Sequence, residues 1–393
     1  MRFGQSQRMS AVQAPIVPVV GEWIRQHPGT ISLAQGVVSY GPPPAAAEAV
    51  RLFLDRGGEH KYGAVQGLTE LRHAIAAKLR SENRIDPGDG EDRIIVTAGA
   101  NMAFLNALFA IADPGDEIIL PLPHYFNHEM AIRMLNCAPV AVPTDSHYQL
   151  QIEALRRAIT PRTRAIVTIS PNNPSGAVYP ADVLSAVNAL CRDAGLYHIS
   201  DEAYEHFTYD GALHYSPGSI MDSGGHTISL YSLSKSWGFA AWRIGYMVVP
   251  PQLYPAILKA QDTNLICASL IAQVAATAVM RSSPDYRADR LADLARIRTT
   301  VLEELGQIGG FCRMPIPNGA FYVLLDLDSS LPDIELAHRL IREHGVAVLP
   351  GSAFGLTGGC HLRISYGALA ADTAVAGIHR LAQGLIALCS RAR

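Results

Sequence analysis

Residues 229–246 read Ser-Leu-Tyr-Ser-Leu-Ser-Lys-Ser-Trp-Gly-Phe-Ala-Ala-Trp-Arg-Ile-Gly-Tyr, with Lys235 near the centre and Arg243 eight residues later. An apolar run at 227–233 favours one β-strand, and a second apolar run at 244–249 favours another. The chain between them carries a single lysine among small hydroxyl residues. A lysine between two core strands is desolvated, and desolvation lowers the pKa of its amine. We therefore expect Lys235 to be partly neutral.

A partly neutral amine can form a Schiff base with an aldehyde, and the neighbours of Lys235 suit an aldehyde cofactor that carries a phosphate. The hydroxyls of Ser232 and Ser234 can donate to phosphate oxygens, and Arg243 adds a permanently charged fork of donors. The segment alone leaves a plainer alternative open, in which the lysine lies at a strand end beside an ordinary ion pair.

The composition bounds the class of protein. With 393 residues, of which 49% are hydrophobic, the chain can form two or three domain-sized units with a large buried core. The formal net charge of −3 gives no electrostatic reason to expect nucleic acid or an anionic membrane as a partner. The cysteines lack the spacing of a disulfide framework or a zinc site. Neither a signal-peptide pattern nor an apolar run of roughly 20 residues is found, so we expect a cytoplasmic protein without a metal.

Short apolar strands alternate with helical patterns from residue 45 to about residue 280. The expected strands are 93–97, 117–120, 140–143, 164–170, 197–201, 227–233 and 244–249. Such alternation favours a mostly parallel sheet covered on both faces, with ligands at the carboxyl ends of the strands. A charged amphipathic helix at 285–306 then leads into a smaller α+β region. Its expected strands are 320–327, 346–349 and 361–365.

Further stretches carry groups that suit a phosphate or a carboxylate. Gly99, Ala100 and Asn101 form a small-residue turn before an apolar helix, and backbone N–H groups at a helix start bind anions. Asp201 ends an expected strand with a carboxylate, although it could instead cap a helix. Arg363 lies inside an expected strand, where a guanidinium without an anion partner is costly.

Together these stretches resemble the class I and II aminotransferases, which are pyridoxal phosphate (PLP) enzymes of the aspartate aminotransferase fold. The pattern SxSKxxxxxxxRxGY around Lys235 matches the family's segment for the lysine that holds PLP as an internal aldimine. The resemblance covers essentially the whole chain, with the motifs in the family's order. The matching segments are 31–44, 61–72, 94–108, 120–127, 170–176, 200–206, 348–355 and 362–367.

The resemblance implies a three-layer α/β fold. A large PLP-binding domain with a mostly parallel sheet is expected at 46–284 and a smaller α+β domain at 285–393. The N-terminal segment 1–45 is implied to pack with the small domain. The family also implies a homodimer with shared active sites, in which Tyr62 of each chain reaches the PLP phosphate of its partner.

The resemblance also implies the residues that contact PLP. These are Tyr62, Gly99, Ala100, Asn101, Tyr125, Asn173, Asp201, Tyr204, Ser232, Ser234, Lys235 and Arg243. Tyr125 matches the aromatic residue on the face of the cofactor ring. Asp201 matches the carboxylate that keeps the pyridine nitrogen protonated, which makes the ring an electron sink. Tyr204 and Asn173 match the residues that reach the phenolic oxygen.

The substrate carboxylate is implied to meet Gly36, Asn173 and Arg363, since a guanidinium binds a carboxylate with two parallel hydrogen bonds. Taken singly, Gly36 could be needed only to let the chain turn, and Asn173 could be present only because an asparagine before a proline favours a turn. The chain departs from the family at 37–40, where Val-Val-Ser-Tyr replaces a Pro-Asp-Phe type of sequence. His124 is also unusual, and either contacts substrate or is an ordinary loop histidine.

The predicted function is therefore PLP-dependent transamination between an L-amino acid and a 2-oxo acid. Lys235 is expected to form the aldimine and to move the substrate Cα proton, with Asp201 and Tyr204 assisting, and pyridoxamine phosphate carries the amino group. Three alternatives keep the cofactor. They are a β-lyase, an amino acid oxidase and a non-catalytic PLP-sensing domain.

Overall fold

The computed structural model describes residues 3–58, 60–88, 93–282 and 285–389. Within these residues the central sheet has seven strands in the order β2-β8-β7-β6-β5-β3-β4. The strands are β2 (Ile94–Thr97), β3 (Glu117–Pro121), β4 (Ala138–Val142), β5 (Thr163–Ile169), β6 (Tyr197–Asp201), β7 (Thr227–Ser232) and β8 (Gly245–Val248). Strand β8 runs antiparallel to both neighbours, and the other described pairs are parallel. The expected mostly parallel sheet is confirmed.

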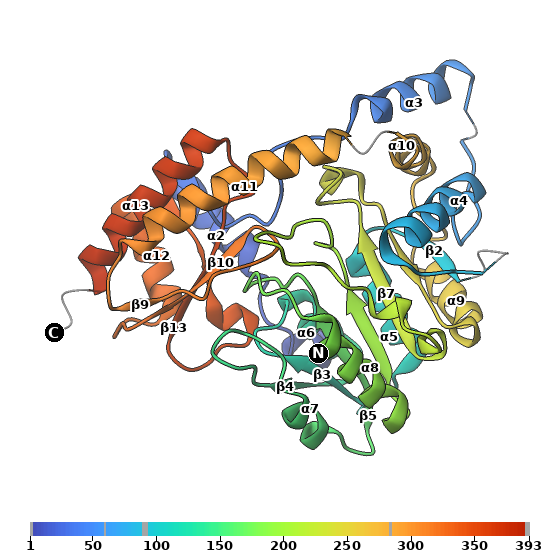
Figure 1. Cartoon of the computed structure of the whole chain (residues 1–393), viewed down its shortest axis with the longest axis horizontal. Helices are drawn as coiled ribbons and strands as arrows, with labels where there is room; N and C mark the ends of the chain where they lie inside the picture. Colours follow the sequence, from blue (N-terminus) through green and yellow to red (C-terminus); the bar gives the residue numbers. More distant parts are fainter. Residues whose placement is uncertain (1–2, 59, 89–92, 283–284, 390–393) are drawn as a thin grey trace.

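The strands are apolar on both faces because helices cover both faces (Figure 1). Successive residues of a strand point to opposite sides. In β3, for example, Ile118 and Ile119 enter different hydrophobic clusters. One cluster includes residues of α5 (Ala100–Ile111), α6 (Phe126–Met134) and α9 (Tyr254–Asn264). Others on the sheet include residues of α3 (Pro44–Asp55), α4 (Thr69–Lys78), α7 (Ile152–Ala158), α8 (Ala181–Ala194) and α10 (Leu270–Met280).

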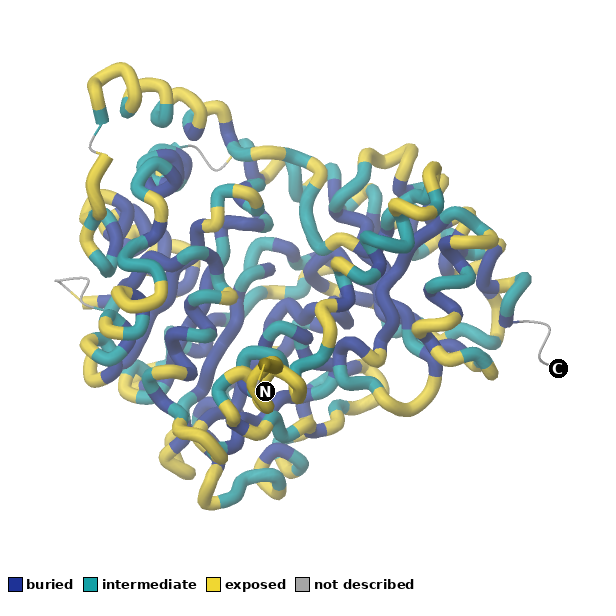
Figure 2. The backbone as a smooth tube through the Cα atoms, turned by 180° about the vertical axis from the view of Figure 1, so that it is seen from behind, coloured by how far each residue is buried: buried dark blue, intermediate teal, exposed yellow. Residues whose placement is uncertain are grey.

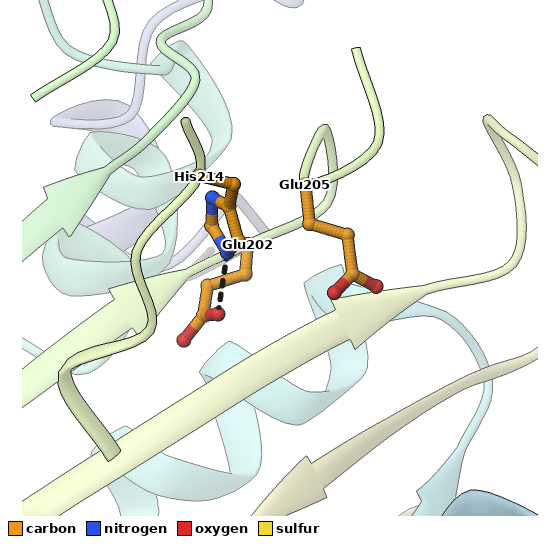
Figure 3. A group of neighbouring side chains, drawn as sticks. All are labelled: Glu202, Glu205 and His214. Atoms are coloured by element: carbon orange, nitrogen blue, oxygen red, sulfur yellow. Dashed lines mark hydrogen bonds and ion pairs between the residues drawn. The ribbon is translucent and has the colours of Figure 1, made fainter. Parts of the chain in front are cut away.

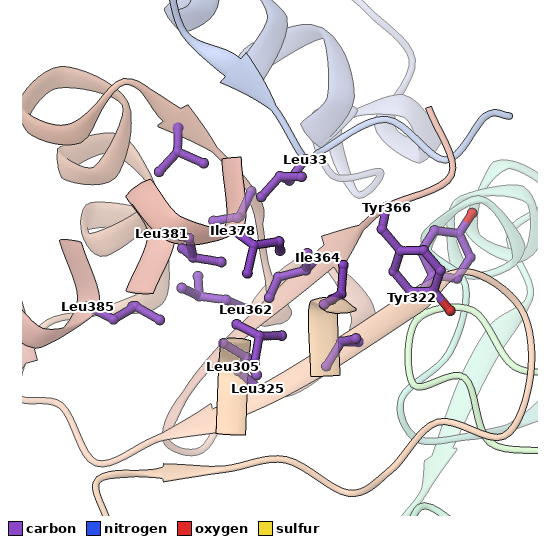
Figure 4. Close-up of a cluster of buried hydrophobic side chains, with 14 of the residues drawn as sticks. Leu33, Leu305, Tyr322, Leu325, Leu362, Ile364, Tyr366, Ile378, Leu381 and Leu385 are labelled. Atoms are coloured by element: carbon purple, nitrogen blue, oxygen red, sulfur yellow. The ribbon is translucent and has the colours of Figure 1, made fainter. Parts of the chain in front are cut away.

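A second hydrophobic core forms in the C-terminal part of the chain (Figure 4). Its antiparallel sheet has the order β12-β13-β10-β9 within the described residues. The elements are α11 (Asp285–Gly306), β9 (Cys312–Arg313), β10 (Tyr322–Leu327), α12 (Asp333–His344), β12 (Leu349–Pro350), β13 (Cys360–Ser365) and α13 (Ala371–Cys389). Leu362 and Ile364 of β13 pack with Leu381 of α13 in this core. The helix predicted at 285–306 is confirmed.

The single strand predicted at 346–349 is wrong, because the chain divides there between two sheets. Strand β11 (Val346–Ala347) pairs in parallel with β1 (Ile31–Ser32), whereas Leu349 and Pro350 pair with β13. The N-terminal segment thus pairs with the C-terminal part through β1. Helix α2 (Ile16–Gln26) packs on α12, while the short α1 (Gln7–Ser10) contacts α6. The domain limits after residues 45 and 284 stay a prediction.

Burial follows this layered arrangement (Figure 2), and the buried backbone lies mainly in the two larger sheets and the helices against them. Helix α3 is an exception, since Leu52 and Leu54 are exposed and Ala46 is the buried residue that the helix offers among its described residues. None of the described helices is long and apolar enough to cross a lipid bilayer.

Candidate active site

Lys235 lies on the turn that follows β7, beyond the carboxyl end of that strand. Its Nζ donates a hydrogen bond to the carbonyl oxygen of Gly36 at 2.6 Å. Burial, followed by the positive charges of Arg363 and Arg243, lowers the pKa of the Lys235 amine to about 8, against the opposing effect of Asp201. The partly neutral amine expected from the sequence therefore agrees with its surroundings.

A cavity of about 270 Å³ adjoins this amine at the carboxyl ends of β5, β6 and β7. It is lined by Val37, Ala100, Asn101, Tyr125, Ile169, Asn173, Asp201, Ala203, Tyr204, Ser232, Ser234, Lys235, Ala240 and Arg243. Most of the predicted site residues thus meet around one space. Gly99, Gly36 and Arg363 touch residues of this wall, whereas Tyr62 does not line the cavity of its own chain.

One end of the cavity is built to receive an anion. Gly99 has φ +83°, and a Cβ added there would come within 2.4 Å of Arg243 Nη2, so only glycine lets the guanidinium approach the start of α5. A Cβ at Gly245 would come within 2.9 Å of the Ala100 nitrogen. Arg243 Nη1 also donates to Ser234 Oγ at 3.3 Å. Backbone N–H groups at a helix start, a guanidinium and hydroxyls together suit a phosphate.

Asp201 supplies an acid at the end of β6, where only 6% of the residue is exposed. Its Oδ2 lies 3.1 Å from Nε2 of His128, and its Oδ1 accepts from the Ala203 nitrogen at 3.1 Å. Turns rather than a helix follow Asp201 in the described chain, so the alternative of a helix cap is wrong. His128, which stacks on Phe104 with ring centroids 4.0 Å apart, was not predicted. No local sequence pattern marks it, because its partner Asp201 lies 73 positions further along the chain.

A chain of hydrogen bonds joins Arg363 to Tyr204. Arg363 is 2% exposed, and its Nη1 donates to Asn173 Oδ1 at 3.0 Å. Asn173 Nδ2 donates to Tyr204 Oη at 3.4 Å, and Tyr204 Oη lies 2.7 Å from Tyr322 Oη. Burial, followed by the neighbouring Tyr322, raises the pKa of Tyr204 well above its usual value. Tyr322 was also missed, because nothing in its strand sequence marks it.

Arg363 keeps unused binding capacity. Its Nε has no hydrogen-bond partner among the described residues, and burial lowers the pKa of its guanidinium. An arginine nevertheless remains charged in proteins, so a buried guanidinium with a free donor favours an anionic ligand.

His124 and Tyr125, the two residues before α6, have different surroundings. Tyr125 lines the cavity, and its hydroxyl accepts from Asn127 Nδ2 at 2.8 Å. His124 is buried but does not line the cavity, and a Cβ at Gly355 would come within 2.5 Å of its Nε2. Burial lowers the pKa of His124 to about 4, so this imidazole is neutral at physiological pH. The packing alternative for His124 therefore fits the geometry better than contact with substrate.

The side chains of Glu202, Glu205 and His214 form a polar cluster (Figure 3). Glu202 follows Asp201 on the chain, and its Oε2 lies 2.9 Å from His214 Nε2. Glu202, Glu205 and His214 bring their ligand atoms within 4.8 Å of one another, the spacing of a cation site. The ammonium of Lys78 already pairs with Glu205. A larger cavity of about 800 Å³ opens beside His214, but none of the predicted site residues lines it.

Comparisons with known proteins agree with this fold. The family model described as aminotransferase class I and II matches residues 28–381. The chain therefore belongs to the class I and II aminotransferases, a family of PLP-dependent enzymes, and it has the fold of the aspartate aminotransferases.

Relatives of the chain span nearly its full length. It is 35% identical to a probable aspartate/prephenate aminotransferase of Aquifex aeolicus, over 98% of this chain and 99% of the relative. The structure of Thermus thermophilus aspartate aminotransferase with maleate has a TM-score of 0.88 and 34% identity, over 98% of this chain and 100% of the other. An aromatic aminotransferase of Pyrococcus horikoshii has a TM-score of 0.86 and 33% identity, over 93% and 98% of the two chains.

Proposed function

We propose that the protein is a transaminase that binds PLP at Lys235 and exchanges amino groups between L-amino acids and 2-oxo acids. The observation that carries this proposal is the part-buried amine of Lys235, whose pKa is lowered to about 8. It faces a cavity that has an anion corner at Arg243 and a carboxylate at Asp201. A reactive amine, a phosphate site and an acid around one space are the groups that PLP chemistry requires.

The residues fit PLP on structural grounds. Any side chain at position 99 would collide with Arg243. Gly99 therefore leaves space where the phosphate would lie. Asp201, held by His128 at 3.1 Å, would keep a proton on the pyridine nitrogen. Tyr125 would lie against the ring. When bound, PLP supplies an aldehyde that condenses with amines and a ring that accepts electrons.

The chain's own residues then have distinct tasks. Arg363 binds the α-carboxylate of the amino acid with its unused donor, and Asn173 supports this contact through the hydrogen bond at 3.0 Å. Lys235 Nζ takes the proton from the substrate Cα and returns it later in the cycle. Its lowered pKa suits this task, because a general base works best when its pKa lies near the operating pH.

Relatives suggest the substrates to examine first. The named activities of the matched proteins concern aspartate, prephenate and aromatic amino acids. We propose acidic and aromatic L-amino acids as donors. The test is a donor screen in which the oxo acid, ammonia and peroxide are measured together. Oxo acid in equal amount to the new amino acid supports transamination, free ammonia indicates a β-lyase, and peroxide indicates an oxidase. Cofactor binding without any product supports a sensing domain.

We also propose that the active protein is a homodimer. Tyr62 is 81% exposed in the single chain. It lines a groove of about 700 Å³ whose walls include Leu52, Phe53, Leu270 and Val274. An exposed phenol beside an apolar groove suits contact with another protein surface. A second copy seated there would place Tyr62 at the partner's anion corner, as the family resemblance implies.

The domain limits are part of the same proposal. We assign 1–45 to an N-terminal segment, 46–284 to the PLP-binding domain and 285–393 to the small domain. The start of α11 at Asp285 and the pairing of β1 with β11 support these limits. We further propose that the protein acts in the cytoplasm.

A further inference from the structure

The direction of the hydrogen bonds around Tyr204 follows from simple chemistry. A guanidinium only donates, so the Asn173 oxygen must face Arg363 and the Asn173 nitrogen must face Tyr204. The Asn173 amide therefore donates to Tyr204 Oη, although at 3.4 Å this is a long hydrogen bond. The arginine therefore fixes the orientation of the Asn173 amide.

The second contact of Tyr204 comes from Tyr322. Their hydroxyl oxygens lie 2.7 Å apart, and either can be the donor on distance alone. Tyr322 is fully buried, and among the described residues its hydroxyl has Tyr204 Oη as its hydrogen-bond partner. A buried hydroxyl proton needs an acceptor, and Tyr204 Oη provides one. With both lone-pair directions of Tyr204 Oη occupied, its own proton is left to point into the cavity.

We propose that Tyr322 is a positioning residue that turns the Tyr204 proton into the cavity and supports the Arg363 guanidinium. The ring of Tyr322 lies under that guanidinium, with Cζ of Arg363 4.6 Å from the ring centroid. Tyr322 thus links Arg363, the predicted site of the substrate carboxylate, to Tyr204, the predicted hydrogen-bond donor to the cofactor. The close approach of Gly36 agrees with this role, because a Cβ there would lie 2.4 Å from Tyr322 Oη. The inference rests on the proposed function, in which Tyr204 reaches the phenolic oxygen of PLP.

Tyr322→Phe separates the two tasks, since it removes the hydroxyl and keeps the ring. The readout is the pH titration of the visible absorption of the PLP-loaded enzyme, which a merely structural role would leave unchanged. Without the hydrogen bond donated by Tyr322, the Tyr204 proton can turn away from the cavity. The anionic phenolic oxygen of PLP then loses its hydrogen-bond donor. We expect the titration midpoint to rise by about half a pH unit to one unit. The KM for the amino donor should stay within about twofold.

Two further variants complete the design. Tyr322→Leu also removes the ring beneath Arg363, and we expect the KM for the amino donor to rise about tenfold in addition. Tyr246→Phe is the matched control, because Tyr246 is also buried in a strand and its hydroxyl has no hydrogen-bond partner among the described residues. It should move neither the titration nor the KM.

Tyr204→Phe distinguishes failure of this inference from failure of the proposed function. If Tyr204→Phe moves the midpoint and Tyr322→Phe does not, Tyr322 does not position Tyr204. If the wild type fails to bind PLP at Lys235, or if Tyr204→Phe leaves the midpoint unchanged, the proposed site is wrong. Neutron diffraction of the wild-type holoenzyme tests the same point without a variant. A deuteron of Tyr322 that points away from Tyr204 would overturn the inference.

Discussion

The lowered pKa of Lys235 predicts unusual reactivity of this amine in the protein before PLP is added. An ordinary lysine with a pKa of about 10.5 is neutral in about one molecule in a thousand at pH 7.5. With a pKa of about 8, about a quarter of the Lys235 amines are neutral at that pH. Only the neutral amine attacks a carbonyl, so the reactive fraction rises on the order of two-hundredfold.

Reductive methylation with formaldehyde, followed by peptide mass spectrometry, measures this reactivity residue by residue. The sequence contains four lysines, namely Lys61, Lys78, Lys235 and Lys259, so each can be assigned without ambiguity. Lys61 and Lys259 are exposed and serve as references in the same digest. Restricted access of the reagent slows the reaction of the neutral amine at every pH, so it lowers the maximal rate but does not move the midpoint. We expect the rate at Lys235 to reach half of its maximum at about pH 8.

Two substitutions should move that midpoint in opposite directions. Arg363 lowers the pKa of Lys235, so Arg363→Gln should raise the midpoint. Asp201 raises that pKa, so Asp201→Asn should lower the midpoint and increase labelling at neutral pH. A Lys235 midpoint equal to those of the exposed lysines would refute the reasoning, and so would a shift of the same sign in both variants.

Three other predictions concern the loaded enzyme. Asp201→Ala should still bind PLP, but loss of the charged partner of the pyridine nitrogen should raise the barrier by about 4 kcal/mol and slow proton transfer about a thousandfold; unchanged single-turnover rates would show that Asp201 is structural. Arg363→Lys should weaken amino acids by about ten- to a hundredfold and the corresponding simple amines far less, because the two-pronged contact with the carboxylate is lost; equal losses for both substrate types contradict the assignment. If each shared site needs both residues, Tyr62→Ala and Lys235→Ala homodimers are inactive, and refolding them together makes roughly half of the dimers mixed, with about a quarter of all sites native. Recovered activity measures those sites, and mixed dimers that are confirmed by mass but remain inactive exclude the shared site.

Local signals were sufficient for the main outline of the fold. The strands at 94–97, 117–121 and 197–201 lie within one residue of their predicted bounds, because each is an apolar run between turn residues. The helix at 285–306 follows from its charged, periodic pattern. The chain at 346–350 was misread as one strand, because sequence periodicity cannot tell which of two sheets will supply the hydrogen-bond partners.

Some residues of the candidate site could likewise be found from the sequence, and others could not. Lys235, Arg243 and Asp201 could be found from the sequence because each lies in a motif at a strand end, where ligands of such sheets bind. His128 and Tyr322 could not, since their importance comes from contacts across 73 and 118 positions of the chain, with Asp201 and Tyr204.

The sequence by itself determined which chemical groups the protein carries and the edge of the sheet at which they gather. Only the tertiary structure decided how those groups act on one another. The lowered pKa of Lys235 depends on burial and on Arg363, which lies 128 positions further along the chain. The orientation of Tyr204, in the turn after β6, likewise depends on Tyr322 of β10. Electrostatic and hydrogen-bond energies depend on distance and burial in space, and separation along the sequence does not specify either.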